Sequence, residues 1–449
     1  MRWRTPGTFG NFCVYPEVIT IADALASEMS FQITQTVTQH RRQKRSLESA
    51  GSSQSRRGLD WMNFFTADVQ TGFGAFVSLY LAEMQWSQES VGIALTIGRI
   101  SGVIGVIPAG ALVDTIRSKR GLAAAGLLMI AIAALLLALH PTLPFVLVAE
   151  ALHGLTAGIL GPAIAAISLG LVGRSAMSLR IGRNHRYDAA GNALTAVAMG
   201  ALGKYFTSKA IFLMAAALVI PALIGLGRIR GDEIDYNRAR NAGRGEKGPN
   251  VKKIMELRKN SDLLWFAGCL ALFQLSDASM LPLVSERLGQ SRLEFDTLLL
   301  SGLIAAPQLV VAFCSPWVGY CSELWGRKPL LLVGFGLEII RGAIFAFVTN
   351  SYWLTAVQIL DGLSGAIITV LTVVIITDLT ADTGRFNLAR GVVSMITGVA
   401  ASVSTAASGL VWQRSGATTA FLSLAAVAVI ATALLWYRMP ETKPAQYAD

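Results

Sequence analysis

The chain has 449 residues, of which 53% are hydrophobic and only 15% charged, and its mean hydropathy is +0.53. Because an ordinary soluble domain carries about 25% charged residues, this composition excludes a soluble protein and indicates an integral membrane protein. The formal net charge of +10 is concentrated in a few loops, which favours a role in membrane topology over binding to nucleic acid.

The first 58 residues are polar, and Ser, Gln and Arg dominate the second half of this segment. We interpret residues 1–58 as a disordered cytosolic tail. The apolar segment 18–26 is short and interrupted by Asp23, so it does not predict a secretory signal. Two alternatives remain open: a functional tail, or an over-extended start whose true first residue is Met29 or a later one.

Apolar runs of about 20 residues can cross a hydrocarbon core about 30 Å thick as helices. Twelve runs bounded by charge, Pro or Gly follow the tail. Six form a predicted N-terminal bundle at 59–227 and six a C-terminal bundle at 262–438, joined by a polar cytosolic linker at 228–261 and followed by a cytosolic tail at 439–449. The predicted helices are 59–82, 90–113, 120–139, 143–170, 186–206 and 208–227, then 262–285, 297–320, 328–348, 352–377, 388–411 and 417–438.

Lysine and arginine are distributed unequally between the two sides of this arrangement. With the N-terminus inside, most of them fall in the tails, the linker and the inner loops, including Arg174, Arg180, Arg183 and Arg186 after the fourth helix. Since basic residues of short loops stay cytoplasmic, we expect both termini in the cytoplasm and the chain in the inner (plasma) membrane. The outer loops contain only Lys204, Lys209, Arg287, Arg292 and Arg414.

The sequence carries no pattern that predicts catalysis or a bound cofactor. HExxH, GxSxG and Asp-rich motifs are absent, as is the Gly-Lys-Ser/Thr loop that binds nucleotide phosphates. The four cysteines form neither a CxxC pair nor a disulfide framework and are interpreted as packing thiols. We therefore expect no enzyme activity, no cofactor and no metal site.

Two stretches repeat the same pattern. GALVDTIRSKR (110–120) and GYCSELWGRKP (319–329) each place a glycine, an acid four residues later and then basic residues, 209 positions apart. The same shift aligns Asp68 with Asp277, and a shift of 208 aligns HGLT (153–156) with DGLS (361–364). This register predicts two parallel six-helix halves related by a pseudo-twofold axis, with a substrate site between them near the midplane.

This repeated pattern, between helices two and three and between helices eight and nine, resembles the signature loop of the major facilitator superfamily over residues 58–440. The stretch NFFTADVQTGFGAF (63–76) is similar to a little-characterised bacterial group of that family. The resemblance implies an all-α membrane protein of 12 transmembrane helices in two pseudo-symmetric bundles that transports by alternating access. The second loop keeps the family pattern, whereas the first has Arg117 where the family usually has a glycine and Ser118 where it has a base.

The repeated acids predict a contact between the halves. Asp114 ends its helix, where the helix dipole disfavours an acid by up to about 1 kcal/mol, so it needs an outside partner. The N-terminus of the eleventh helix, near Arg390, offers free backbone N–H groups, and Glu323 could meet the fifth helix near Arg186 in the same way. The alternative is a plain basic loop with incidental acids. The predicted latch comprises Gly110, Asp114, Lys119, Arg120, Gly319, Glu323, Gly326, Arg327 and Lys328.

Ionisable residues within the predicted helices form a second set of candidates, because each costs about 2.5–3.5 kcal/mol to insert at a helix centre. Arg99 and Glu150 lie at similar depths and could pair, either as a structural ion pair or in coupling. Glu338 and Arg341 lie three residues apart and predict an intrahelical pair. The candidates for the cavity and proton coupling are Asp68, Arg99, Glu150, His153, Asp277 and Asp361.

His153 and Asp361 are the leading candidates for proton coupling, since histidine titrates near physiological pH and burial raises a carboxylate towards it. Their alternatives are a packing histidine and an aspartate that caps a kink at Gly362. Asp68 and Asp277 could bind substrate or hold their helices to neighbours.

The leading interpretation is a proton-coupled secondary transporter of a small organic solute, a drug or a metabolite. The partners expected are that solute, protons and membrane lipids, with a monomer as the functional unit. Import and export, or efflux, stay open because the only Gly-Pro pair near the fifth helix, residues 161–162, belongs to the fourth. The alternatives are a non-transporting sensor or scaffold with the same fold, and a membrane-embedded transferase.

Overall fold

The computed structural model describes residues 51–71, 77, 80–81, 84–242, 260–289, 297–348 and 350–443. Among these residues the regular structure is helical, with one isolated bridge between Ala242 and Thr383. Eight of the described helices are long and apolar enough to cross a membrane. The all-α membrane fold predicted from the sequence is confirmed.

The first half begins with α2, which starts at Ser53, so the predicted tail boundary at residue 58 falls inside this helix. The loop after the fourth helix is shorter than predicted: η1 (Arg174–Ala176) leads directly into α7, which therefore carries three of the four arginines assigned to that loop. The helices of this half are α2 (Ser53–Thr71), α4 (Gln88–Thr115), α5 (Lys119–Leu139), α6 (Leu143–Val172), α7 (Met177–Tyr205) and α8 (Ser208–Gly227).

The second half differs from the prediction at its first helix, which is broken in two directly after Asp277. Its last two predicted helices are continuous in α16 except at Gly416, whose φ of 83° reverses the chain; glycine adopts this left-handed backbone without the strain a side chain causes. The helices are α11 (Ser261–Asp277), α12 (Met280–Gly289), α13 (Thr297–Trp325), α14 (Arg327–Phe347), α15 (Ser351–Leu379) and α16 (Phe386–Arg438).

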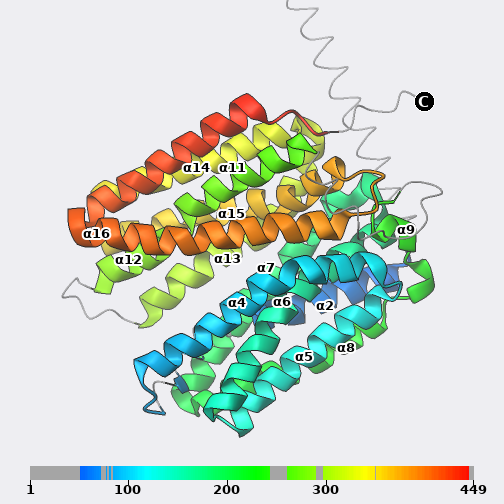
Figure 1. The fold of residues 1–449 in the computed structure, drawn as a ribbon, viewed down its shortest axis with the longest axis horizontal. Helices are drawn as coiled ribbons and strands as arrows, with labels where there is room; N and C mark the ends of the chain where they lie inside the picture. Colours follow the sequence, from blue (N-terminus) through cyan, green and yellow to red (C-terminus); the bar gives the residue numbers. More distant parts are fainter. Residues whose placement is uncertain are drawn as a thin grey trace, which may run out of the picture.

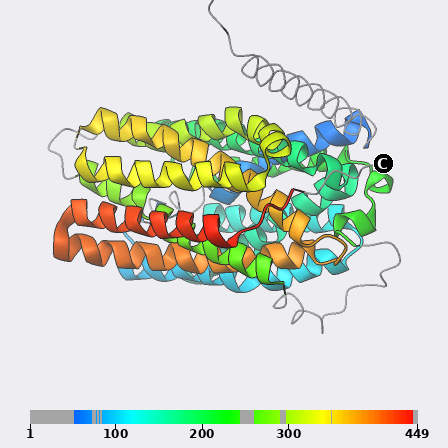
Figure 2. The same cartoon turned by 90° about the horizontal axis from the view of Figure 1, so that it is seen from above.

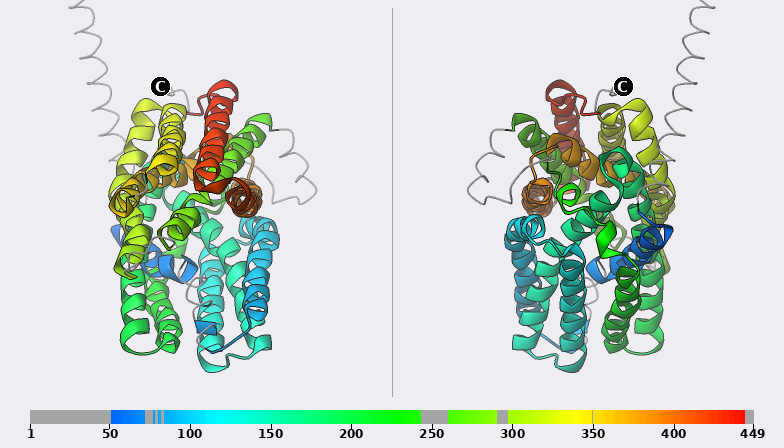
Figure 3. Two further views of the ribbon diagram at one scale, coloured as in Figure 1. Left: turned by 90° about the vertical axis from the view of Figure 1, so that its left-hand side faces the viewer. Right: turned by 90° about the vertical axis from the view of Figure 1, so that its right-hand side faces the viewer.

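The two halves lie side by side with their helices along the long axis of the molecule (Figure 1), and the view from above shows the same alignment (Figure 2). Seen along that axis, the halves form two stacked bundles (Figure 3). They meet where α4 packs against α16 and where α7 packs against α13. We call the end of the molecule that bears residues 110–120 and 319–329 the signature end.

Small residues allow the helices of the first half to approach closely. On α6, a Cβ at Gly154 would overlap the backbone carbonyl of Gly98 on α4, and one at Gly158 would lie 3.2 Å from the Cα of Val106. Without side chains between them, the two backbones gain van der Waals contact, which drives helix association in lipid.

Part of the predicted linker is folded. It contains η2 (Gly231–Glu233) and α9 (Tyr236–Ala239) and lies across the signature end. Glu233 holds the start of α2, since it accepts hydrogen bonds from the Ser52 amide at 2.8 Å and the Ser52 hydroxyl at 3.0 Å. Residues 243–259 of the linker and residues 1–50 lie outside the described residues, so the predicted disorder of the N-terminal tail is tested only at its end.

Candidate functional site

Asp114 links the two halves at the signature end. Its carboxylate accepts hydrogen bonds from the backbone amide of Leu388 at 2.9 Å, the backbone amide of Asn387 at 3.3 Å and the Asn387 side-chain amide at 2.7 Å. These groups belong to the first turn of α16, whose N–H groups have no partner within the helix. The carboxylate of Asp114 at the end of α4 thus provides hydrogen-bond acceptors for the unpaired N–H groups at the start of α16, a helix of the other half. Arg390 does not join this contact but donates to the Gly161 carbonyl at 2.6 Å.

The same contact recurs between the other two helices of the interface. A Cβ at Gly110 would overlap the backbone carbonyl oxygen of Asn387, and one at Gly319 would lie 2.6 Å from that of Ser178. Adding 209 to 110 and to 178 gives 319 and 387, so the two contacts are exchanged by the repeat. Both glycines are required because any side chain there would separate the halves.

A second pair of glycines extends this symmetry deeper into the interface. A Cβ at Gly391 would lie 2.7 Å from the Val106 carbonyl oxygen, and one at Gly182 would lie 2.5 Å from that of Ser315. The same shift of 209 relates 182 to 391 and 106 to 315. The two halves therefore pack backbone to backbone along two equivalent seams.

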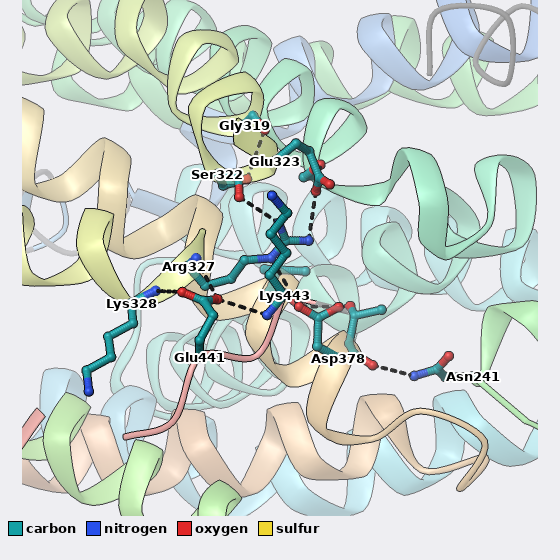
Figure 4. A network of polar contacts seen from close by, with 12 residues as sticks. Asn241, Gly319, Ser322, Glu323, Arg327, Lys328, Asp378, Glu441 and Lys443 are labelled. Carbon is teal, nitrogen blue, oxygen red and sulfur yellow. Dashed lines mark hydrogen bonds and ion pairs between the residues drawn. The ribbon is translucent and has the colours of Figure 1, made fainter. Parts of the chain in front are cut away.

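The second signature loop is organised around Arg327 (Figure 4). Its guanidinium donates to Glu323 at 2.7 Å, to Asp378 at 3.2 Å and to the Ser322 carbonyl at 2.6 Å, and its side chain is buried. Glu323 also accepts from the Ser178 hydroxyl at 2.7 Å, at the start of α7. The predicted contact near Arg186 was wrong in its partner, because α7 begins at Met177 and its N-terminus lies earlier in the chain.

The C-terminal segment closes this network. Glu441 accepts from the backbone amides of Arg327 at 2.8 Å and Lys328 at 3.1 Å, in the first turn of α14. Gly326 precedes this turn with φ of 95°, and a Cβ there would overlap the Glu441 carboxylate. Lys328 donates to the Trp436 carbonyl at 2.7 Å. The two residues that follow Gly326 are thus held by Glu441, which lies in the chain after α16.

The first signature loop is stabilised differently, as its departure from the family pattern suggests. Lys119 is buried and donates to the backbone carbonyls of Val113 and Ile116, which lack partners at the end of α4. Its ammonium lies 4.9 Å from the ring centroid of Tyr236. The hydroxyl of Tyr236 donates to the Thr115 carbonyl at 3.1 Å. A lysine and a linker tyrosine thus cap this helix, where the second loop uses an arginine and two acids.

The linker joins the two halves at the signature end. In the first half, the amide of Asp235 donates to the Gly170 carbonyl at 3.2 Å. In the second half, the side-chain amide of Asn241 donates to the Thr377 carbonyl at 2.7 Å, and its own carbonyl accepts from the Gly384 amide at 3.1 Å. Sequence composition missed this segment because it is polar, and its backbone is held by hydrogen bonds more than by apolar burial.

One ion pair between the halves is exposed, and we expect it to contribute little. Arg174 and Asp382 pair at 2.5 Å, with 42% and 62% of their side chains exposed. Surface pairs of this kind contribute about 0–1 kcal/mol. Replacing Arg174 by Gln should therefore leave the thermal unfolding midpoint of the detergent-solubilised protein nearly unchanged, and a large fall in that midpoint would contradict this assignment.

Four ionisable residues from three helices, α11, α14 and α15, meet in the second half. Arg341 on α14 donates to Asp277 at 2.8 Å, to Asp361 at 2.6 Å and to Glu338 at 3.1 Å. The predicted pair of Glu338 and Arg341 is present, and it belongs to this larger cluster. Asp277 and Asp361, assigned to separate helices by the sequence, are brought onto the same guanidinium. We call these four residues the carboxylate cluster.

The carboxylate cluster has a buried side and an accessible side. Glu338 and Arg341 are 0% and 1% exposed, whereas Asp277 and Asp361 retain 25% and 28%. The carboxyl groups of Asp277 and Asp361 both accept from Nη1 of Arg341, so the two acids lie next to each other on the accessible side. With three acids and one base, the cluster is suited to take up positive charge.

The break between α11 and α12 positions Asp277. The residue ends α11, and Ala278 and Ser279 form a turn before α12 begins. The Ser279 hydroxyl then lies 2.5 Å from the Ser404 hydroxyl of α16. Broken helices in membranes occur where backbone groups find other partners or line a cavity. The apolar run at 262–285 gave no sign of this break.

The structure does not form the pair expected between Arg99 and Glu150. Arg99 is exposed and is in none of the ion pairs among the described residues. The reason is helical phase: α4 presents Gly98 to the carboxyl group of Glu150, and the next residue projects about 100° further around the helix. Glu150 is buried. His153 lies one turn from it, half-buried, and the side chain of Asp68 lies outside the described residues.

A buried ion cluster in the first half was missed by the sequence analysis. Asp60 of α2 accepts from Arg180 at 2.5 Å and from Arg183 at 2.6 Å, and Arg180 donates further to Asn184 at 2.7 Å. Arg180 and Asp60 are buried. The two arginines were counted as loop charges. Their spacing of three residues, one turn apart on a helix face, was the signal that they shared a partner.

The structure is that of a duplicated helical membrane protein with equivalent seams between its halves, which defines the class of two-bundle transporters. Comparison with known proteins gives the family. The model of the Major Facilitator Superfamily matches residues 59–320 and 279–448. The chain belongs to this superfamily.

Two relatives are uncharacterised MFS-type transporters of Mycobacterium tuberculosis, one from strain CDC 1551 / Oshkosh and one from strain H37Rv. Each is 36% identical to this chain over 389 residues, which cover 86% of the chain and 93% of the relative. The similarity thus extends over nearly the whole of both proteins.

Proposed function

We propose that the protein is a proton-coupled secondary transporter of a small organic solute. The observation that supports this proposal most strongly is the carboxylate cluster, in which three acids share one arginine and two of them are accessible. A cluster with a surplus of acids binds a proton readily. Because the cluster is partly buried, release of that proton would depend on a rearrangement of the helices.

The seams at the signature end supply the conformational part of the proposal. In this state the halves are in backbone contact there, with Asp114 and Glu323 each bound to a helix start of the opposite half. We infer that these contacts form the cytoplasmic gate and that the repeated residues act as its latch. The excess of Lys and Arg at this end supports a cytoplasmic location for both termini.

Transport by reconstituted protein tests this function. Proteoliposomes containing a pH-sensitive dye would be screened with sugars, carboxylic acids and fluorescent cationic dyes such as ethidium, for movement of solute and of protons. For a solute that moves, Asp361→Asn should abolish the acceleration by a pH gradient while solute exchange at equal pH continues, because the cluster then has one fewer site for a proton.

The matched control is Asp232→Asn, which removes an acid from the exposed part of the linker and should leave the response to the gradient intact. Equal acceleration by the gradient in Asp361→Asn and in the wild-type protein would contradict the coupling role. If no gradient moves any solute of a broad panel, the alternative of a sensor or scaffold is favoured.

A further inference from the structure

A pocket with a basic lining opens at the signature end between α5 and α8. Its volume is about 480 Å³. Arg117, Lys119 and Arg120 contribute its polar side, and Leu223 and Leu226 contribute its apolar side. None of the described residues that line it is acidic. The pocket therefore carries positive charge that its own walls do not neutralise.

Two of the three cations are free to bind an anion. Lys119 is turned inward to the carbonyls of its own loop. Arg117 is exposed, and Arg120 makes one long hydrogen bond, from Nη2 to the Gly227 carbonyl at 3.4 Å. The Nε of Arg120 is buried without a hydrogen-bond partner among the described residues. Neither arginine is in an ion pair with a described carboxylate.

The pocket adjoins a surface that must face lipid. Leu128 and Ile132 of α5 are each 50% exposed, and Ile220 and Ile224 of α8 are 62% and 52% exposed. In a membrane these apolar side chains lie against acyl chains. The two guanidinium groups lie at the polar end of the same two helices, which is the depth of phospholipid headgroups.

We propose that this pocket binds the headgroup of an anionic phospholipid. Its phosphate would accept hydrogen bonds from Arg117 and Arg120, since guanidinium groups suit phosphate geometry, and its acyl chains would follow the exposed faces of α5 and α8. A zwitterionic lipid fits less well, because the lining offers no carboxylate for its ammonium group. Basic clusters next to a membrane surface attract anionic lipids through the same attraction of opposite charges.

The bound lipid would act on the loop next to the gate. The Arg117 guanidinium lies 5.6 Å from the ring centroid of Tyr236, and the Tyr236 hydroxyl also contacts the carbonyl of Asp114 at 3.3 Å. A phosphate on Arg117 would thus hold the segment that carries the latch acid.

Lipid-dependent thermal stabilisation of the purified full-length protein tests the pocket without any transported solute, so its result is independent of the transport assay. Phosphatidylglycerol added to detergent micelles should raise the unfolding midpoint of the wild-type protein, and phosphatidylcholine should raise it less. The double variant Arg117→Gln, Arg120→Gln should lose the difference between the two lipids. Arg117→Lys, Arg120→Lys keeps the charge and should retain part of it.

The matched control is Arg438→Gln, which removes an exposed arginine from the same end but outside the pocket and should behave as wild type. An equal response of the double Gln variant and the wild type to phosphatidylglycerol would overturn the proposal. Inorganic phosphate alone should give no shift; a shift as large as that from phosphatidylglycerol would assign the site to a free phosphate and overturn the lipid as its ligand. If the double Gln variant does not fold, native mass spectrometry of the Lys variant replaces it. Less bound phosphatidylglycerol than in the wild type supports the pocket, and an equal amount overturns it.

Discussion

Replacing Arg341 by Met should destabilise the protein by roughly 3–5 kcal/mol, the range found when one partner of a buried ion pair is removed. The arginine is 1% exposed and is bonded to three carboxylates. Without it, Glu338 in particular is left with a buried charge that must be neutralised by a proton. Thermal unfolding in detergent, followed by tryptophan fluorescence, measures the loss as a lower midpoint.

A compensated variant separates charge from packing. Combining Arg341→Met with Asp277→Asn, Glu338→Gln and Asp361→Asn removes the whole cluster of charges at nearly constant shape, and replacing an entire buried ion cluster is often neutral for stability. We therefore expect the combined variant to recover most of the lost midpoint. If it is no more stable than Arg341→Met alone, the effect comes from packing of the arginine side chain and the electrostatic account is wrong.

Asp114→Asn should shift the protein away from the state in which the signature end is closed. The substitution keeps the shape but removes the charge from hydrogen bonds to Asn387 and Leu388. Hydrogen bonds to charged groups contribute about 1.5–3 kcal/mol, which corresponds to a roughly 10- to 100-fold change in the equilibrium. Membrane insertion should be unaffected, and transport should fall.

Spin labels on exposed residues of the two halves, at Ser175 and Tyr437, report this shift in a background without the native cysteines. Electron resonance should show a longer distance between them gaining population in Asp114→Asn. Arg174→Gln serves as the control, because it removes a charge from the same interface at an exposed position. An unchanged distance distribution in Asp114→Asn would show that the acid does not stabilise the closed end.

The two signature loops explain why the latch need not be symmetric. The second loop holds its acid through Arg327, which also binds Asp378. At the equivalent position the first loop has Ser118, the N-cap of α5, whose hydroxyl accepts from the Gly121 amide at 3.1 Å. Among the described residues, the hydrogen bonds to the Asp114 carboxylate come from α16, and its loop is held by Lys119 and the linker. We therefore expect Asp114 to be the more sensitive of the two acids to substitution.

Much of the fold was predictable because a bilayer imposes strong constraints on sequence. Helices α5 and α8 match their predicted ranges to within one residue at each end, since uninterrupted apolar runs have one stable conformation in lipid. The position of Asp114 at a helix C-terminus predicted that it would need a partner and that the start of the eleventh helix could provide one, and its carboxylate lies there. Boundaries failed where polar residues are helical, as at Ser53 and Met177, because hydropathy does not distinguish a polar helix from a loop.

The sequence by itself determined the membrane class, the duplicated halves and the two acids that contact the opposite half at the signature end, since apolar length, charge distribution and internal register are properties of the chain alone. The tertiary structure decided which charges meet: it separated Arg99 from Glu150, joined Asp277, Glu338 and Asp361 on Arg341, and buried Asp60 with Arg180. Such pairings depend on the rotation of each helix about its axis, which packing of small residues such as Gly98 and Gly154 sets.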